Sequence, residues 1–333
     1  MCGIAKSASK KGEINMFDNV SIAVMYAVTP CHAGSGSALG VVDLPIQRER
    51  HTNWPMIQAS GVKGAFRANF DRFKSRITTE NDINLTTITE SIFGTDKGNS
   101  GSNDSNSGYA GSLSVSDAKI LAYPMRSNVS PFVWITCPSV LKRLSLDLEI
   151  AGMDSFDSDV FSRAIINEND AIILSNDGNA IRTEQNQQNC QVLLEDFEVT
   201  LRQEPNVEAE FNKINSYFIA ARRLLLVSDE VFNYGVTDCT QIMAQIAIDS
   251  KTGTTATGSL RYQEELPSDT IMYTVIHWGD SKNNLDGNLT ANIIKDYITN
   301  RVIKDYIQIA GDETCGRGIF KLSWFSNVNQ NTN

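Results

Sequence analysis

Short apolar stretches recur along this chain, and their length and residue types predict β-strands. Buried strands favour runs of Val, Ile, Phe and Tyr, and such runs occupy residues 21–29, 132–137 and 171–175. Residues 222–232 start in the same way and then become polar, which predicts a strand followed by a turn or helix start at Ser228. Residues 307–325 predict a strand, a glycine-rich turn and a second strand.

Two segments have the apolar period of an amphipathic helix. In residues 59–77 the apolar side chains return every three or four positions, and they are Val62, Phe66, Phe70, Phe73 and Ile77. Ser60 has a side chain that commonly accepts a hydrogen bond at a helix N-cap. Residues 288–307 show a similar pattern and predict a second helix.

Two further segments have a different character. Residues 94–112 are rich in Gly, Ser and Asn, a composition typical of a flexible loop. Residues 242–266 alternate in polarity on both sides of a Gly/Thr-rich centre, which predicts a β-hairpin. Strands, a few helices and long insertions together predict the α+β class rather than a doubly wound α/β sheet.

The composition is that of a soluble globular protein. The chain has 333 residues, 41% of them hydrophobic and 20% charged, and no apolar stretch is long enough for a membrane helix. The six cysteines are widely spaced and form no CxxC pair, which argues against a zinc cluster and predicts reduced thiols in the cytoplasm. Three histidines, His32, His51 and His277, are too few for a multi-histidine metal centre.

Charge is distributed unevenly along the chain. The formal net charge is -10, and a uniformly acidic surface would repel a polyanion. Residues 44–76, however, hold seven Lys or Arg against two acids, a balance of +5, whereas residues 145–170 hold seven acids against one Arg, a balance of -6. The basic window predicts a surface for a nucleic-acid backbone; a solvated helix face is the ordinary alternative.

Asp43 lies in the stretch "GVVDLPIQRERHT", residues 40–52, beside Arg48 and Arg50. RNA cleavage by transesterification needs an aligned and activated 2′-hydroxyl and neutralisation of the developing phosphorane charge. A single carboxylate can serve by accepting the proton or by holding a divalent cation, and the two arginines would then fix phosphates. The alternative is an ion pair between Asp43 and an arginine that closes a turn.

Two glycine-rich stretches are candidate anion sites. "GSGSALG", residues 34–40, lacks the Gly-Lys-Ser/Thr ending of a phosphate-binding loop. "GDETCGRG", residues 311–318, places Arg317 between Gly316 and Gly318, and exposed backbone amides there could hold an anion; a tight turn in a hairpin is the alternative. His32 precedes the first stretch, and three roles stay open for it: a structural residue, a phosphate contact or a general base.

Several stretches together resemble one family. They occur in the family's order from about Ile22 to Leu322 and are "TPCHAGSGSALGVVDLPIQRERHT", "ASGVKGAFR", "SGYAGSLSVSDAKILAYPMRS", "FVWITCPSVLKRL", "LLLVSDEVF", "YQEELPSDT" and "IQIAGDETCGRGIFKL". This family is the backbone subunit of the type III-B (Cmr) CRISPR interference complex, in the RAMP superfamily. The resemblance implies a modified RRM-like (ferredoxin-like) palm with helical finger insertions and a β-hairpin thumb.

The resemblance also implies a domain organisation. Residues 1–20 would be an N-terminal extension and residues 326–333 a C-terminal tail. Between them, residues 21–325 would form a single RAMP domain that contains the flexible loop 94–112 and the thumb hairpin 242–266.

The family's function implies roles for particular residues. Copies would polymerise along a CRISPR guide RNA and cut the paired target RNA at regular intervals, with Asp43 as the catalytic residue and ligand of a divalent cation, Mg²⁺ or Mn²⁺. Tyr262 and Glu264 would assist. The residues expected to contact RNA are His32, Arg48, Arg50, Ser60, Lys63, Arg67, Gly311, Gly316, Arg317 and Gly318. Implied partners are guide RNA, target RNA, further copies of the chain, and the large cyclase/nuclease-like, small helical and capping RAMP subunits.

The sequence departs from the family pattern at Ala310, where a second glycine is usual, and at Asn53, which replaces a common glycine. Asparagine tolerates a positive φ. Two alternatives stay open: a structural subunit that binds guide RNA without cutting, and a standalone enzyme for precursor RNA, which the lack of a histidine pair disfavours.

Overall fold

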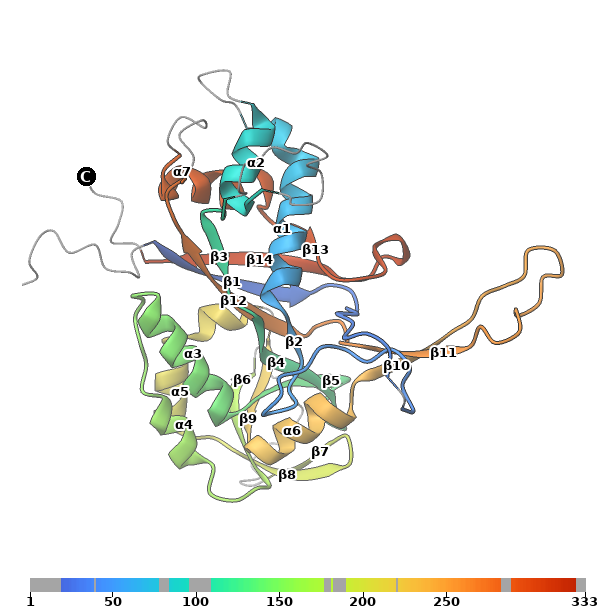
Figure 1. The fold of residues 1–333 in the computed structure, drawn as a ribbon. Coiled ribbons are helices and arrows are strands. Elements are labelled where there is room, and N and C mark those ends of the chain that lie inside the picture. Colours follow the sequence, from blue (N-terminus) through green and yellow to red (C-terminus); the bar gives the residue numbers. More distant parts are fainter. Residues whose placement is uncertain are drawn as a thin grey trace, which may run out of the picture.

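Neighbouring antiparallel strands of one larger sheet lie at the centre of the molecule (Figure 1). The computed structural model describes residues 19–38, 40–77, 84–95, 109–176, 181, 190–219, 221–282 and 289–327. The central strands follow the spatial order β14-β1-β12-β4, with every neighbouring pair antiparallel. They are β1 (Val20–Ala27), β4 (Ala118–Arg126), β12 (Ile271–Trp278) and β14 (Ile319–Ser326).

Two helices complete this palm. Helix α1 (Ala59–Phe73) connects β1 to β4, and α7 (Ala291–Asp296) connects β12 to β14, so the chain order is β-α-β-β-α-β, as in ferredoxin-like folds. The ring of Phe66 on α1 packs 6.0 Å from that of Trp324 on β14, which places α1 on one face of the sheet. The predicted α+β palm is confirmed.

The long segment between β4 and β12 extends the sheet and adds helices. Its strands continue from β4 in the order β5-β9-β6-β8-β7, and Figure 1 shows α3 to α6 gathered around them. These elements are β5 (Phe132–Thr136), α3 (Pro138–Ile150), α4 (Ser158–Ala164), β6 (Asp170–Asn176), β7 (Cys190–Leu194), β8 (Phe197–Arg202), α5 (Pro205–Phe211), β9 (Arg223–Val227) and α6 (Asp229–Asp238). As predicted, Ser228 caps α6, since its Oγ accepts a hydrogen bond from Val231 N.

A hairpin arm projects from the body just before β12 (Figure 1). Its strands, β10 (Gln241–Gln245) and β11 (Arg261–Glu265), pair antiparallel over five positions, as the pattern of residues 242–266 predicts. Most of the N-terminal extension, the 94–112 loop and the C-terminal tail lies outside the described residues. The shorter elements are β2 (Met56–Ile57), η1 (Lys74–Arg76), α2 (Leu85–Phe93), β3 (Leu113–Val115), η3 (Asn215–Phe218), η5 (Tyr297–Val302), β13 (Tyr306–Gln308) and η6 (Glu313–Cys315).

Two details of the predicted helices are wrong. Helix α1 begins at Ala59, with Gln58 and not Ser60 as its N-cap residue; the Ala59 amide donates instead to Asp117 Oδ1 at 2.7 Å, a partner far along the chain. The helix predicted over 288–307 ends early, because Tyr306–Gln308 forms the edge strand β13, which pairs with β14. In the described part of the chain, no helix has both the length and the apolar character needed to cross a bilayer.

Candidate functional site

Asp43 lies at the base of the hairpin arm. Residues 44–46 run parallel to β11: Leu44 N donates to Tyr262 O at 3.0 Å, and Glu264 N donates to Leu44 O at 2.9 Å. Asp43 stands at the end of this pairing, and its carboxylate is partly exposed. The carboxylate Oδ2 accepts a hydrogen bond from Tyr262 N at 2.7 Å. The backbone therefore fixes where the carboxylate points.

The Asp43 carboxylate has no ion pair with any described residue, so the turn-closing ion pair is not what the structure contains. Arg48 pairs with Glu264 instead, and Arg50 is exposed. Among the described residues, the amide of Tyr262 is the one hydrogen-bond donor to the Asp43 side chain. The other oxygen of Asp43, Oδ1, therefore remains available to a substrate hydroxyl or a hydrated cation.

The side chains of Glu264 and Arg48 are largely buried and pair with each other. The Glu264 side chain is 8% exposed and the Arg48 side chain 15%. Glu264 Oε1 accepts from Arg48 Nη2 and from Thr240 Oγ1, and its Oε2 accepts from Ile46 N at 3.0 Å. Arg48 also donates to two backbone carbonyls, those of Asn53 and Val236.

A buried carboxylate needs a cation and hydrogen bonds to offset its lost hydration, and Glu264 has both. The geometry thus makes Glu264 and Arg48 positioning residues that hold the segment of Asp43 against β11. The predicted catalytic role of Glu264 and the predicted phosphate contact of Arg48 stay predictions.

Tyr262 lies beside Asp43, and His32 contacts the same strand, β11, two residues further along. Tyr262 is 42% exposed on the arm. His32 is half-buried, and its Nδ1 lies 2.7 Å from Glu264 O, while Cys31 and Leu266 exchange backbone hydrogen bonds of 2.9 Å next to it. Gly34 leaves room for the imidazole, since a Cβ there would stand 2.7 Å from His32 Nε2.

The glycine-rich turn after β13, residues 311–318, contacts strand β11. Arg317 Nε lies 3.2 Å from Oε1 of the fully buried Glu265, and Gln263 Nε2 donates to Asp312 Oδ2 at 2.6 Å. The amides of Cys315, Gly316 and Arg317 donate to carbonyls within the turn. The turn also joins β11 to residues 30–32, because Gly311 N donates to His32 O and Gly318 N to Pro30 O. These five amides are engaged within the protein, and the contact of this turn with RNA stays a prediction.

Left-handed backbone in this turn leads to a matched pair of stability predictions. Gly318 has φ 70°, and a Cβ there would stand 2.0 Å from Ile309 O, whereas Ala310 already has φ 77°. We expect Gly318→Ala to lower the free energy of unfolding by at least about 2 kcal/mol. We expect Ala310→Gly to raise it by about 0.5–1 kcal/mol. Urea titration of both variants measures the difference; a stabilising Gly318→Ala would contradict the assigned backbone.

The residues of α1 that are predicted to contact guide RNA share one face of the helix. Ser60, Lys63 and Arg67 follow one another at spacings of three and four; Ser60 is exposed. Lys63 Nζ donates to Leu113 O at 2.9 Å, and Arg67 Nη1 donates to Gly94 O at 2.8 Å. These carbonyls orient the two cations.

Two residues of this surface were missed by sequence reasoning. Burial lowers the pKa of Lys63, and the nearby Arg67 and Lys282 lower it further, so the exposed Lys282 adds a third positive charge from a distant part of the chain. Gln47 links this helix to the loop near Asp43: its Oε1 accepts from Gln58 N and its Nε2 donates to Gly34 O. Gln47 lies within the quoted motif, but no local signal indicated Lys282.

A preformed metal centre is absent from the described residues, where no group of three or more His, Cys, Asp or Glu side chains could hold an ion. Asp43 alone matches the donor set of Mg²⁺ or Mn²⁺ only if RNA phosphates and water complete the coordination, as Mg²⁺ commonly allows.

An RRM-like palm with a projecting arm and a carboxylate at the arm's base defines the class of this protein. Residues 24–321 match the profile of the RAMP superfamily, and the chain belongs to this family, as the sequence predicts. It is 33% identical over 309 residues to "CRISPR system Cmr endoribonuclease Cmr4" of Pyrococcus furiosus, covering 90% of this chain and 93% of that protein.

Solved structures have the same fold. A chain of the cryo-EM structure of type III-B Cmr-beta bound to cognate target RNA superposes with a TM-score of 0.69 at 24% identity, over 93% of this chain and 98% of that one. The crystal structure of oligomeric Cmr4 from Pyrococcus furiosus gives a TM-score of 0.65 at 25% identity, over 93% of this chain and 99% of that one.

Proposed function

We propose that this chain is the RNA-cutting backbone subunit of a type III-B CRISPR complex. Copies of it would line a guide RNA, and each would cut the paired target RNA once, which spaces the cuts regularly. The observation that carries this proposal is the Asp43 carboxylate, which is held by Tyr262 N and has no ion pair with a described residue. The related endoribonuclease and the target-bound relative support it.

The chain's own groups suit transesterification. Asp43 Oδ1 would accept the proton of the ribose 2′-hydroxyl, and the hydrogen bond from Tyr262 N to Oδ2 would keep the carboxylate aimed at that hydroxyl. In-line attack also needs the ribose and the phosphate fixed in place. The exposed Tyr262 and the half-buried His32 would position the scissile link.

A divalent cation fits this site as a partner of the RNA. Asp43 would hold Mg²⁺ or Mn²⁺ together with phosphate oxygens and water, and the ion would neutralise charge that develops on the phosphate. Asp43 would then share its carboxylate between the cation and the hydroxyl proton.

The basic face of α1 would carry the guide backbone, and a salt titration tests this. We expect Lys63→Gln and Arg67→Gln each to weaken guide RNA binding at all sequences alike, and to reduce the slope of log affinity against log salt by about one. Lys142→Gln, on the exposed side of α3, serves as the matched control. Unchanged slopes in both variants would remove α1 from the RNA path.

One observation favours a second candidate function, that of a structural subunit that does not cut. Asp43 Oδ2 accepts the amide of Tyr262, so the carboxylate also satisfies the backbone at the base of the arm. A purely structural Asp43 would serve in this way alone.

The partners of this subunit follow from the same proposal. They would be guide RNA, target RNA, further copies of the chain, and the large cyclase/nuclease-like, small helical and capping RAMP subunits, assembled in the cytoplasm. The oligomeric relative supports association between copies.

A further inference from the structure

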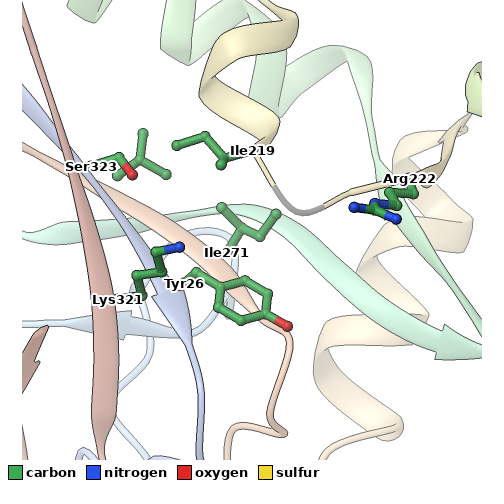
Figure 2. A pocket seen from close by; sticks show the side chains of 7 residues that line it. Tyr26, Ile219, Arg222, Ile271, Lys321 and Ser323 are labelled. Carbon is green, nitrogen blue, oxygen red and sulfur yellow. The ribbon is translucent and has the colours of Figure 1, made fainter. Parts of the chain in front are cut away.

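A hollow of about 270 Å³ lies on the sheet face that α1 does not cover (Figure 2). Successive side chains of a strand point to opposite faces, so Lys321 and Ser323 of β14 point away from the α1 side, where Trp324 packs. Ile271, Tyr26 and Lys321 stand directly opposite one another on β12, β1 and β14. They form one row across the sheet, with Tyr26 in the middle.

The inserted segment between α5 and β9 covers this face only in part. The ring of Tyr217 packs 4.5 Å from that of Phe325, further along β14, and Tyr217 is itself buried. Two residues later Ile219 is 51% exposed, and Tyr26 and Lys321 of the row remain accessible to solvent. The hollow therefore lies where the cover ends.

Its lining combines an apolar floor, an aromatic wall and a cationic rim. Val24 and Ile271 form the buried floor. The Tyr26 hydroxyl donates to Asp269 Oδ1, which fixes the ring at its edge. Arg222 and Lys321 are exposed, stand on opposite sides of this ring in Figure 2, and have no ion pair with a described residue.

This combination has the chemistry of a site for single-stranded nucleic acid. Bases stack on aromatic faces without regard to sequence, and cations beside them hold the phosphates. RRM sheets use the face opposite their helices in this way. The hollow has no acidic residue in its lining, and Oδ1 of the neighbouring Asp269 is already engaged by Tyr26, so the rim has an excess of positive charge.

We propose that this hollow binds one unpaired ribonucleotide, with its base against Tyr26 and Ile219 and its phosphate between Arg222 and Lys321. The inference rests on the proposed function in one respect, that the chain carries RNA; it does not require Asp43 to cut. Tyr26 is six residues from His32, and six extended residues span at most about 20 Å. An RNA strand held near Asp43 can therefore reach the hollow.

Titration of the full-length chain with uridine and adenosine 5′-monophosphate, followed by NMR, tests the proposal. We expect the double variant Arg222→Glu/Lys321→Glu to weaken binding by about tenfold or more, and Lys142→Glu to leave it unchanged. Ser323→Trp fills the hollow at a strand position that tolerates aromatic residues, and it should abolish binding with an unchanged circular dichroism spectrum. Tyr26→Phe keeps the ring and should retain binding.

Two outcomes would overturn the proposal. Wild-type affinity in both the charge-reversed and the filled variant would show that nucleotides bind elsewhere. Unchanged nucleotide binding with a smaller particle in sedimentation would identify the hollow as a contact between copies. Cleavage in the assembled complex is read separately with Asp43→Asn, so failure of the cutting proposal is distinct from failure of this one.

Discussion

A complex assembled with Asp43→Asn subunits binds guide and target RNA normally but cuts the target at least about a hundredfold more slowly. The amide keeps an oxygen that can accept the hydrogen bond from Tyr262 N, so the backbone around the site is preserved. It cannot accept a proton at neutral pH and is a poor cation ligand, and losing a general base typically costs two to four orders of magnitude. Single-turnover cleavage of labelled target measures the effect.

The control for this variant is Asp305→Asn, which changes an exposed carboxylate outside the site and should leave cleavage at the wild-type rate. Cutting that persists in Asp43→Asn would favour the second candidate function, in which Asp43 is purely structural.

A phosphorothioate at the scissile phosphate separates the two roles of Asp43. Slow cleavage in Mg²⁺ that Mn²⁺ restores indicates a bound cation, and equal rates in both indicate proton transfer alone.

Glu264→Ala destabilises the protein itself, by about 3–5 kcal/mol, since it leaves the Arg48 charge buried without its partner. The same change removes the acceptors of Ile46 N and Thr240 Oγ1, so the segment of Asp43 loses its anchor on β11. We expect both a lower urea midpoint and slower cleavage. Tyr262→Phe, an exposed neighbour on the same strand, should leave the urea midpoint unchanged.

The double variant Arg48→Met/Glu264→Leu separates position from chemistry. Apolar residues of similar volume can replace a buried ion pair with little loss of stability, so this variant should recover the part of the urea midpoint that Glu264→Ala loses through the unpaired Arg48 charge. Ile46 N and Thr240 Oγ1 still lack their acceptor in it. A catalytic Glu264 would leave the double variant inactive despite its stability. Measurable cleavage in it would support the positioning role, whereas full stability of Glu264→Ala would contradict the buried network.

Local patterns in the sequence account for much of the fold. The strand at Val20–Ala27, the capping of α6 by Ser228 and the β10–β11 hairpin are all local features, and each follows from residue periodicity or from one side chain beside its own backbone. The α1 cap was missed because its acceptor, Asp117, is 58 residues away. The helix predicted over 288–307 failed because edge pairing with β14 outweighed the helical period.

The candidate site divides in the same way. The sequence by itself determined that one carboxylate, Asp43, stands beside two arginines in a motif of the RAMP superfamily. Only the tertiary structure decided that Arg48 turns inward to Glu264, 216 residues away, while Asp43 keeps an oxygen available. Asp43, close in sequence, and Glu264, far along the chain, are both possible partners of Arg48. Burial decides between them, because a carboxylate that water cannot reach needs a cation more than an exposed one does.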